Sequence, residues 1–140
     1  MEALESHPDS VFVEDTVVAV GDVAVITRMG HPSRRGECDS IKGLLRGLGL
    51  RVIDMRDMGN DDSVDESVLP CCDGGDVLYT GRHLFVGLSE RTNKNGFRFL
   101  KKVFCEIGRL KKDDVIAVPP VIQGKEVLHL KSAGEWRALC

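Results

Sequence analysis

Apolar residues and turn signals in the first half of the chain predict the order strand, strand, helix, strand. Two β-branched runs at 16–20 and 23–27 are separated by Gly21 and Asp22, and a two-residue turn between such runs indicates a β-hairpin. Apolar residues then recur at i, i+3, i+6, i+7 and i+10, which predicts one face of a helix, and residues 51–55 are predicted to form a further strand. The helical face comprises Cys38, Ile41, Leu44, Leu45 and Leu48.

The second half of the chain repeats this order. Runs at 77–80 and 84–88 enclose a turn at Gly81, an amphipathic helix follows, and a strand at 115–118 is stopped by two prolines. The apolar face of this helix comprises Phe97, Leu100, Phe104 and Ile107. Strand-and-helix units that recur about sixty residues apart predict a repeated, radially arranged α/β architecture.

We therefore expect one domain of 140 residues, divided into repeats. The first repeat spans about 10–56 and the second about 71–118, with a polar, acidic linker at about 57–70. An alternating segment at 127–130 predicts a strand, and residues 127–132 are expected to begin a third repeat. Residues 133–140 form a divergent tail.

Composition narrows the classes of function. The 19 basic and 22 acidic residues are interleaved and give a net charge of −3, which argues against a nucleic-acid partner. The longest apolar runs fall well short of 18 residues, so no membrane span is expected, and the acidic N-terminus does not resemble a signal peptide. Five cysteines without metal-ligand or disulfide spacing favour a reduced, cytoplasmic protein with no metal site.

Three acids ahead of the first hairpin are candidates for binding a planar cation. Asp9, Glu14 and Asp15 are clustered, and a carboxylate binds a guanidinium through two parallel hydrogen bonds. The alternative is a solvated strand end, since most charged side chains are exposed. Arg34 and Arg91 each precede a predicted helix and could clamp a carboxylate, or form surface ion pairs of little energetic value.

A second pair of features could carry acid–base chemistry. In the segment 73–76 two glycines, which permit close backbone approach, separate Asp73 from Asp76 at a strand entrance. His129 can transfer protons near neutral pH, and Asp73 is a candidate partner to orient it. The alternatives are a tight turn capped by its own aspartates and a structural histidine.

Taken together, these segments resemble the dimethylarginine dimethylaminohydrolase family of the guanidine-modifying pentein superfamily. The likeness extends over residues 8–132 and rests on several motifs in the same order. They are residues 8–15, 26–28 with 32–35, 73–82, 85–89 with 91–93, and 128–132.

The resemblance implies a pentein-type α/β propeller of ββαβ repeats, with about two of its five blades and the start of a third in this chain. It implies hydrolysis of methylated arginines to citrulline and methylamines, without a cofactor, in the regulation of nitric oxide synthesis. A cysteine thiolate attacks the guanidinium carbon, His129 acts as proton donor and general base, and Asp73 orients it. The substrate-binding residues implied are Asp9, Glu14 and Asp15 for the guanidinium end and Arg34 and Arg91 for the α-amino-acid end.

The chain departs from the family pattern in its nucleophile. No cysteine matches the one that the family uses, and Cys140 lies in a tail without features that would lower its pKa. The first blade has no counterpart upstream of Pro8, so we expect a partial chain. Two alternatives remain open: a truncated, non-catalytic product that binds methylarginine or pairs with another chain, and an enzyme resembling arginine deiminase.

Overall fold

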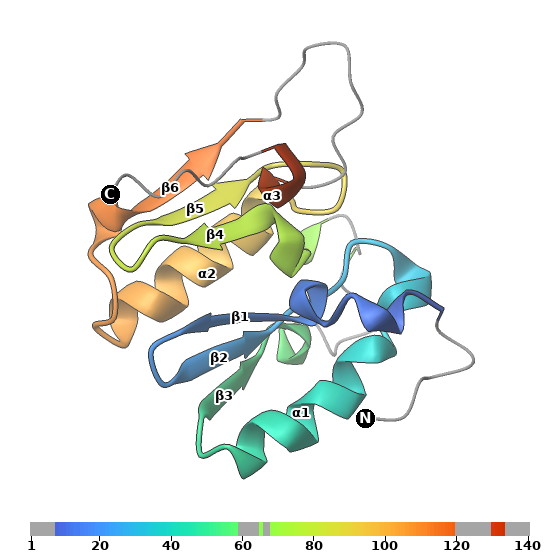
Figure 1. Ribbon diagram of the computed structural model, residues 1–140. Coiled ribbons are helices and arrows are strands. Elements are labelled where there is room, and N and C mark those ends of the chain that lie inside the picture. Colours follow the sequence, from blue (N-terminus) through green and yellow to red (C-terminus); the bar gives the residue numbers. More distant parts are fainter. Residues whose placement is uncertain (1–7, 59–64, 66–67, 120–129, 134–140) are drawn as a thin grey trace.

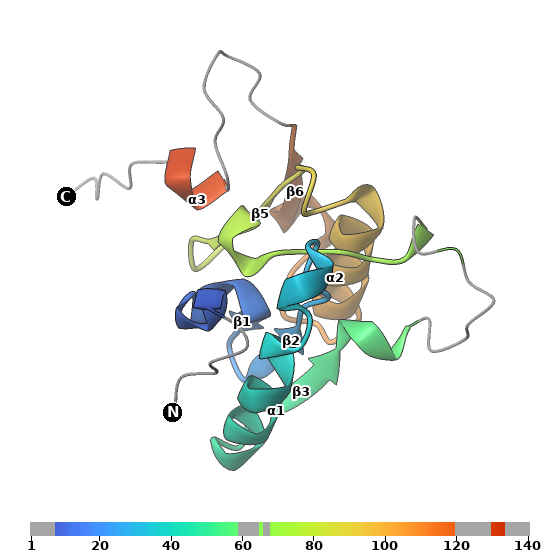
Figure 2. The same ribbon diagram turned by 90° about the vertical axis from the view of Figure 1, so that its right-hand side faces the viewer.

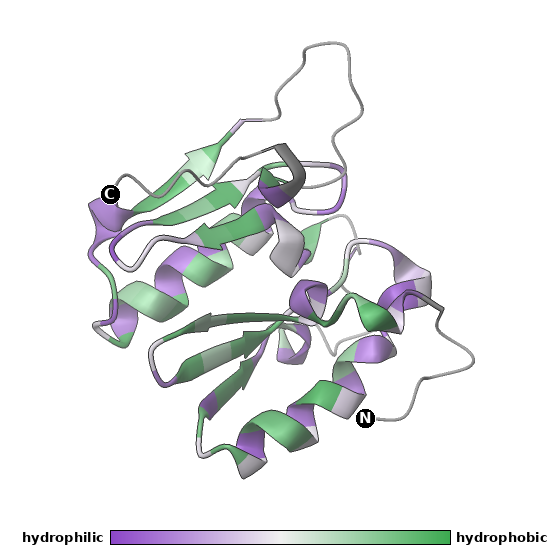
Figure 3. Cartoon of the chain, viewed as in Figure 1, coloured by the Kyte–Doolittle hydropathy of each residue, from purple (hydrophilic) through white to green (hydrophobic). Residues whose placement is uncertain are grey.

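The computed structural model describes residues 8–58, 65, 68–119 and 130–133 and contains two sheets of three strands (Figure 1). Each sheet belongs to a ββαβ unit, as the repeat predicted. Figure 3 shows hydrophobic residues concentrated in the strands and on one side of each long helix.

The first unit contains β1 (Val17–Val20), β2 (Val23–Ile26), α1 (Glu37–Gly47) and β3 (Arg51–Asp54). β1 and β2 are antiparallel and joined through Gly21, whose positive φ of 62° suits a tight hairpin turn. β3 lies parallel to β2, so the sheet order is β1-β2-β3. The predicted strands were one residue too long at one end, because residue 16 and residue 55 belong to 3-10 turns and residue 27 lies past the end of β2.

The second unit repeats this topology with β4 (Val77–Tyr79), β5 (Leu84–Gly87), α2 (Lys94–Glu106) and β6 (Val115–Val118). β4 and β5 are antiparallel around Gly81, which again has positive φ, at 86°. β6 lies parallel to β5, and the order is β4-β5-β6.

The units are stacked as layers that share a core. Alternate residues of β2 face opposite ways: Ala24 and Ile26 pack against α1, whereas Val23 and Val25 join the cluster that contains Leu100 and Phe104 of α2. Figures 1 and 2 show α1 on the outer side of the first sheet and the second unit on its other side. The first sheet is therefore covered on both faces, which explains why β2 is buried at all four positions.

The buried face of α1 is narrower than the sequence pattern predicts. Cys38, Ile41 and Leu45 are buried against the sheet, as expected. Leu44 and Leu48 were wrongly placed on that face, since their side chains are 56% and 66% exposed. Leu44 lies to the side of the stripe that meets a sheet of only three strands, and Leu48 lies beyond the last turn of the helix.

The start of α2 fixes the loop that precedes the second unit. The Asn93 side chain caps the helix by accepting from the Gly96 amide at 2.8 Å, and it also accepts from the Cys71 amide at 3.2 Å. A side chain at Gly96 would collide with the Cys71 carbonyl oxygen, so the helix and the loop lie in direct contact. This contact determines the position of Asp73, two residues further on.

The short helix α3 (Leu130–Ala133) lies beside the beginning of β4 (Figure 1). The strand predicted over 127–130 is therefore wrong at Leu130, whose amide binds a carboxylate of the second unit instead of a neighbouring strand. His129 and the rest of that segment lie outside the described residues. Among the helices that the structure describes, none combines the length and apolar character needed to cross a membrane.

Candidate active site

The candidate site lies where two 3-10 turns, Val13–Thr16 and Gly74–Asp76, lead into the edge strands β1 and β4. The two turns are in contact, because a side chain at Gly74 would collide with the Glu14 carbonyl oxygen. The prediction that glycine permits close backbone approach here is confirmed for Gly74. The described glycines with positive φ lie elsewhere, so space rather than a left-handed conformation requires this residue.

Asp15 is buried and links the two units. One carboxylate oxygen accepts from the Gly75 amide at 2.8 Å, and the other accepts from Nη1 of Arg34 at 2.9 Å. Its backbone carbonyl accepts from the Thr27 hydroxyl at 2.8 Å. The carboxylate is thus held at the junction of the two 3-10 turns.

Arg34 is also buried, between two acids. Nε and Nη2 donate to the two oxygens of Glu37 at 3.1 and 3.0 Å, and Nη1 donates to Asp15. Burial alone would lower the pKa of Arg34, but the hydrogen bonds that it donates to Glu37 and Asp15 raise the pKa above its ordinary value. Arg34 therefore stays charged. The contact between Arg34 and a substrate carboxylate stays a prediction. Glu37 was not identified from the sequence as the partner of Arg34, although an acid three residues after an arginine indicates such an ion pair.

Asp73 is fully buried behind Arg91. One oxygen accepts from the Gly30 amide at 2.9 Å, and the other lies 3.6 Å from Nη1 of Arg91. The Asp73 amide donates to the Thr92 hydroxyl at 3.1 Å. The Arg91 side chain is 29% exposed, so the structure brings together a partly accessible guanidinium and a buried carboxylate, both predicted site residues.

Asp76, which the sequence did not single out as a site residue, accepts three hydrogen bonds. Its Oδ2 accepts from the hydroxyls of Thr92 and Ser89 at 2.6 and 2.7 Å. Its Oδ1 accepts from the Leu130 amide at 3.0 Å. The carboxylate therefore connects the loop that precedes α2 with the start of α3.

The two remaining acids lie at the surface. The Glu14 side chain is 59% exposed and pairs with Nζ of Lys131 at 3.1 Å. Asp9 is exposed, and its carbonyl oxygen accepts from Nη2 of Arg34 at 3.3 Å. The predicted guanidinium-binding acids therefore differ in access, since Asp15 is buried and the other two face solvent.

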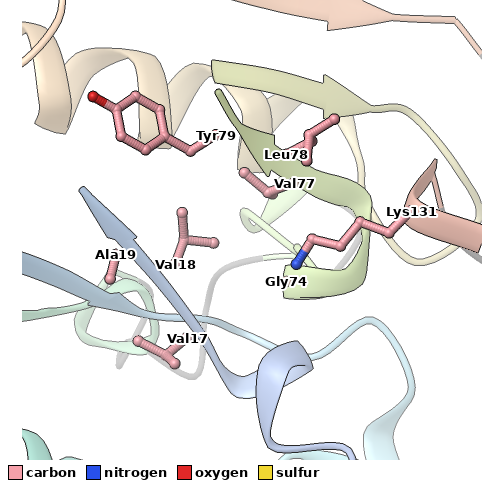
Figure 4. A pocket seen from close by; sticks show the side chains of 8 residues that line it. All are labelled: Val17, Val18, Ala19, Gly74, Val77, Leu78, Tyr79 and Lys131. Atoms are coloured by element: carbon pink, nitrogen blue, oxygen red, sulfur yellow. The ribbon is translucent and has the colours of Figure 1, made fainter. Parts of the chain in front are cut away.

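A hollow of about 230 Å³ opens between the two edge strands. Figure 4 shows apolar side chains of β1 and β4 around it and the Lys131 side chain reaching from α3 toward Gly74. Its lining consists of Val17, Val18, Ala19, Gly74, Val77, Leu78, Tyr79 and Lys131. The Glu14–Lys131 ion pair thus lies at the edge of this hollow.

The buried cysteines are unreactive thiols. Burial raises the pKa of Cys38 to about 11, and burial also raises the pKa of Cys72 far above its ordinary value. Neither residue is a thiolate at neutral pH. Within the described ranges, no three His, Cys, Asp or Glu side chains are grouped so that they would hold a metal ion.

No protein-family model matches the chain, but similar proteins are found by sequence. A protein of Streptomyces coelicolor named N(G),N(G)-dimethylarginine dimethylaminohydrolase is 40% identical over 133 residues, 95% of this chain and 44% of that protein. A Bos taurus protein named putative hydrolase DDAH2 is 42% identical over 135 residues, 96% of this chain and 41% of the relative. The chain spans less than half the length of these relatives.

The fold is similar to solved structures of the same group. The dimethylarginine dimethylaminohydrolase of Pseudomonas aeruginosa, as a cysteine-to-serine mutant complexed with citrulline, superposes with a TM-score of 0.71 at 31% identity over 91% of this chain and 43% of that one. A histidine-to-glycine form of dimethylarginine dimethylaminohydrolase, as an adduct with S-methyl-L-thiocitrulline, has the same TM-score and identity. The predicted α/β pentein fold class is confirmed, while the number of blades stays a prediction. Over more than nine-tenths of its length, the chain is homologous in sequence and fold to part of the dimethylarginine dimethylaminohydrolases.

Proposed function

We propose that this chain forms the guanidinium-binding and acid–base part of an enzyme that hydrolyses methylated arginines to citrulline and methylamines. The observation that carries the proposal is the cluster around Asp73, in which a buried carboxylate, a partly exposed Arg91 and the start of α3 lie around one turn. Two family members of known structure hold citrulline and S-methyl-L-thiocitrulline, which are an expected product and a close analogue of such substrates.

In this proposal Asp73 orients His129. The peptide bond between His129 and Leu130 includes the Leu130 amide, which donates to Asp76. Asp73 and Asp76 lie at the two ends of the same 3-10 turn. A buried carboxylate that accepts from an imidazole N–H selects the tautomer whose other nitrogen can exchange a proton with the reacting group. This chain thereby supplies the acid–base pair of the reaction.

The substrate's cationic end is assigned to the acids near the first turn. A guanidinium displaces the Lys131 ammonium from Glu14 and takes up the charge-assisted hydrogen bonds that carboxylates make with planar cations. Asp15 and Asp9 lie on the same stretch of chain. Because Arg34 is occupied by Glu37 and Asp15, we assign it to fixing Asp15, and we assign the grip on the substrate carboxylate to Arg91.

The chemistry implied by the family proceeds in two displacements. A thiolate attacks the guanidinium carbon, and His129 donates its proton to the leaving methylamine as the carbon–nitrogen bond breaks, which leaves a covalent thiouronium. His129 then removes a proton from water, the resulting hydroxide attacks the same carbon, and the thiolate departs as citrulline forms. The buried residues Cys38 and Cys72 provide no such thiolate, since burial keeps both thiols protonated.

Binding by the chain itself tests the site assignments. Titration with asymmetric dimethylarginine, followed by amide chemical shifts in NMR, is expected to move the signals of Glu14, Arg91 and Leu130 in a saturable manner. Free lysine, which carries a compact ammonium group instead of a planar guanidinium, is expected to bind more weakly than dimethylarginine. Glu14→Gln should weaken binding, whereas Glu90→Gln, at an exposed acid without a place in the site, should not. Equal responses to dimethylarginine and lysine would contradict the proposal.

A further inference from the structure

Each ββαβ unit is joined to the next segment of the chain by the same kind of hydrogen bond. Asp15, at the entrance to β1, accepts from the Gly75 amide of the second unit at 2.8 Å. Asp76, at the corresponding entrance to β4, accepts from the Leu130 amide of α3 at 3.0 Å. In each case an aspartate just ahead of a first strand holds a backbone N–H of a later segment. Because this contact occurs at equivalent positions in both units, we regard it as a structural feature of the repeat.

The second copy of this contact is connected to the candidate catalytic acid. The Thr92 hydroxyl donates to Asp76 at 2.6 Å and accepts from the Asp73 amide at 3.1 Å. Asp73, Thr92 and Asp76 are all buried. The two aspartates therefore belong to one hydrogen-bond network, and displacement of one is transmitted to the other through a single hydroxyl group.

The segment held by Asp76 has little freedom to move toward the sheet. A side chain at Gly87 would come within 2.9 Å of Cβ of Leu130, so α3 lies directly on β5. On its other side, Lys131 pairs with Glu14. The hydrogen bond of the Leu130 amide is thus the partly buried contact that attaches α3, whereas the ion pair of Lys131 is exposed and weak.

We infer that Asp76 is a positioning residue for His129. The Leu130 N–H belongs to the peptide unit that joins Leu130 to His129, so the carboxylate of Asp76 holds the chain at the residue next to the histidine. A charged acceptor suits this role because its hydrogen bonds are stronger than those of a neutral one, and proton transfer depends closely on the geometry of the groups involved. This inference rests on the proposed function, which assigns the acid–base role to His129.

Asp76→Ala in the full chain tests the inference with two NMR readouts. The first is hydrogen exchange at the Leu130 amide, which should accelerate by about tenfold when the acceptor is removed. The second is the titration of the His129 ring, whose midpoint should fall by about one pH unit when the neighbouring Leu130 amide is released from Asp76. Asp76→Asn should retain most of the protection, because its oxygen can still accept from Leu130 while its NH₂ group donates to the Thr92 hydroxyl.

Asp54→Ala serves as the matched control. Asp54 is another buried carboxylate with several donors, but it lies at the end of β3 in the other sheet. Its loss should destabilise the fold without selectively exposing the Leu130 amide. Equal exchange at Leu130 in Asp76→Ala and Asp54→Ala, at matched global stability, would overturn the inference.

A separate variant distinguishes failure of the inference from failure of the proposed function. If Asp73→Asn leaves the His129 titration unchanged, Asp73 does not orient His129 and the acid–base assignment fails. Loss of Leu130 protection in Asp76→Ala, restored in Asp76→Asn, would still support the anchoring of α3 by Asp76. Unchanged Leu130 exchange in Asp76→Ala would refute the anchor whatever Asp73→Asn shows.

Discussion

Buried charges at single residues hold the candidate site in shape. Arg34 lies between Asp15 and Glu37. Removal of one member of a buried ion cluster leaves the other charges buried without a counter-ion or solvent, which is destabilising. The carboxylate of Asp15 in turn holds the second unit through Gly75. Stability and site geometry therefore depend on the same side chains.

Arg34→Ala is expected to destabilise the fold by about 3 to 5 kcal/mol, because Asp15 and Glu37 are left buried without their cation. Arg109→Ala is the control: Arg109 pairs with Asp22 at the surface, where both side chains are substantially exposed, and its loss should cost less than about 1 kcal/mol. Urea unfolding of the two variants measures the difference. Similar losses in both would show that the buried cluster is not a major source of stability.

Asp54 predicts a dependence of stability on pH. Burial alone would raise the pKa of this carboxyl, but hydrogen bonds from Arg56 and Lys42 lower it to about 2. The stabilisation of about 2 kcal/mol is therefore present above the ordinary pKa near 4 and is lost as the pH falls toward 2. The difference in unfolding free energy between the native chain and Asp54→Asn should shrink over that interval, and a constant difference would contradict the assignment.

Among the elements, regular strands and helices were predictable and the 3-10 turns were not. The hairpin turns at Gly21 and Gly81 and the spacing of Leu100 and Phe104 follow from local pattern. The turns that carry Asp15 and Asp76 have no periodicity, and their positions depend on contacts with residues some 60 positions away. The start of α3 likewise depends on a distant carboxylate, which an alternating apolar pattern does not reveal.

Gly74 tests the contact between the two turns. Gly74→Ala would force a methyl group against the Glu14 carbonyl, so we expect a loss of about 1 to 3 kcal/mol or more, together with weaker binding of dimethylarginine. Gly43→Ala is the control within α1, where an added Cβ meets no atom within 4 Å, and it should stabilise by up to about 1 kcal/mol. Thermal unfolding gives both values, and a neutral Gly74→Ala would contradict the close approach.

At the scale of the whole molecule, the layers explain how separate sequence motifs form one site. α2 contributes to the same core as both sheets, which brings the entrances of β1 and β4 together. The sequence predicted the repeat and the residue types of the site. It did not predict that Arg34 faces inward or that Asp76 holds α3, because those partners lie in segments brought together only by the fold.

The most direct test of the central claim replaces the matching segment of the Streptomyces coelicolor relative with residues 8–132 of this chain and measures citrulline released from asymmetric dimethylarginine. The proposal predicts that the chimera releases citrulline, that His129→Ala abolishes release, and that Arg91→Ala mainly raises KM. A chimera that folds with a sharp unfolding transition but releases no citrulline would contradict the claim that these residues form the substrate-binding and acid–base part of the enzyme.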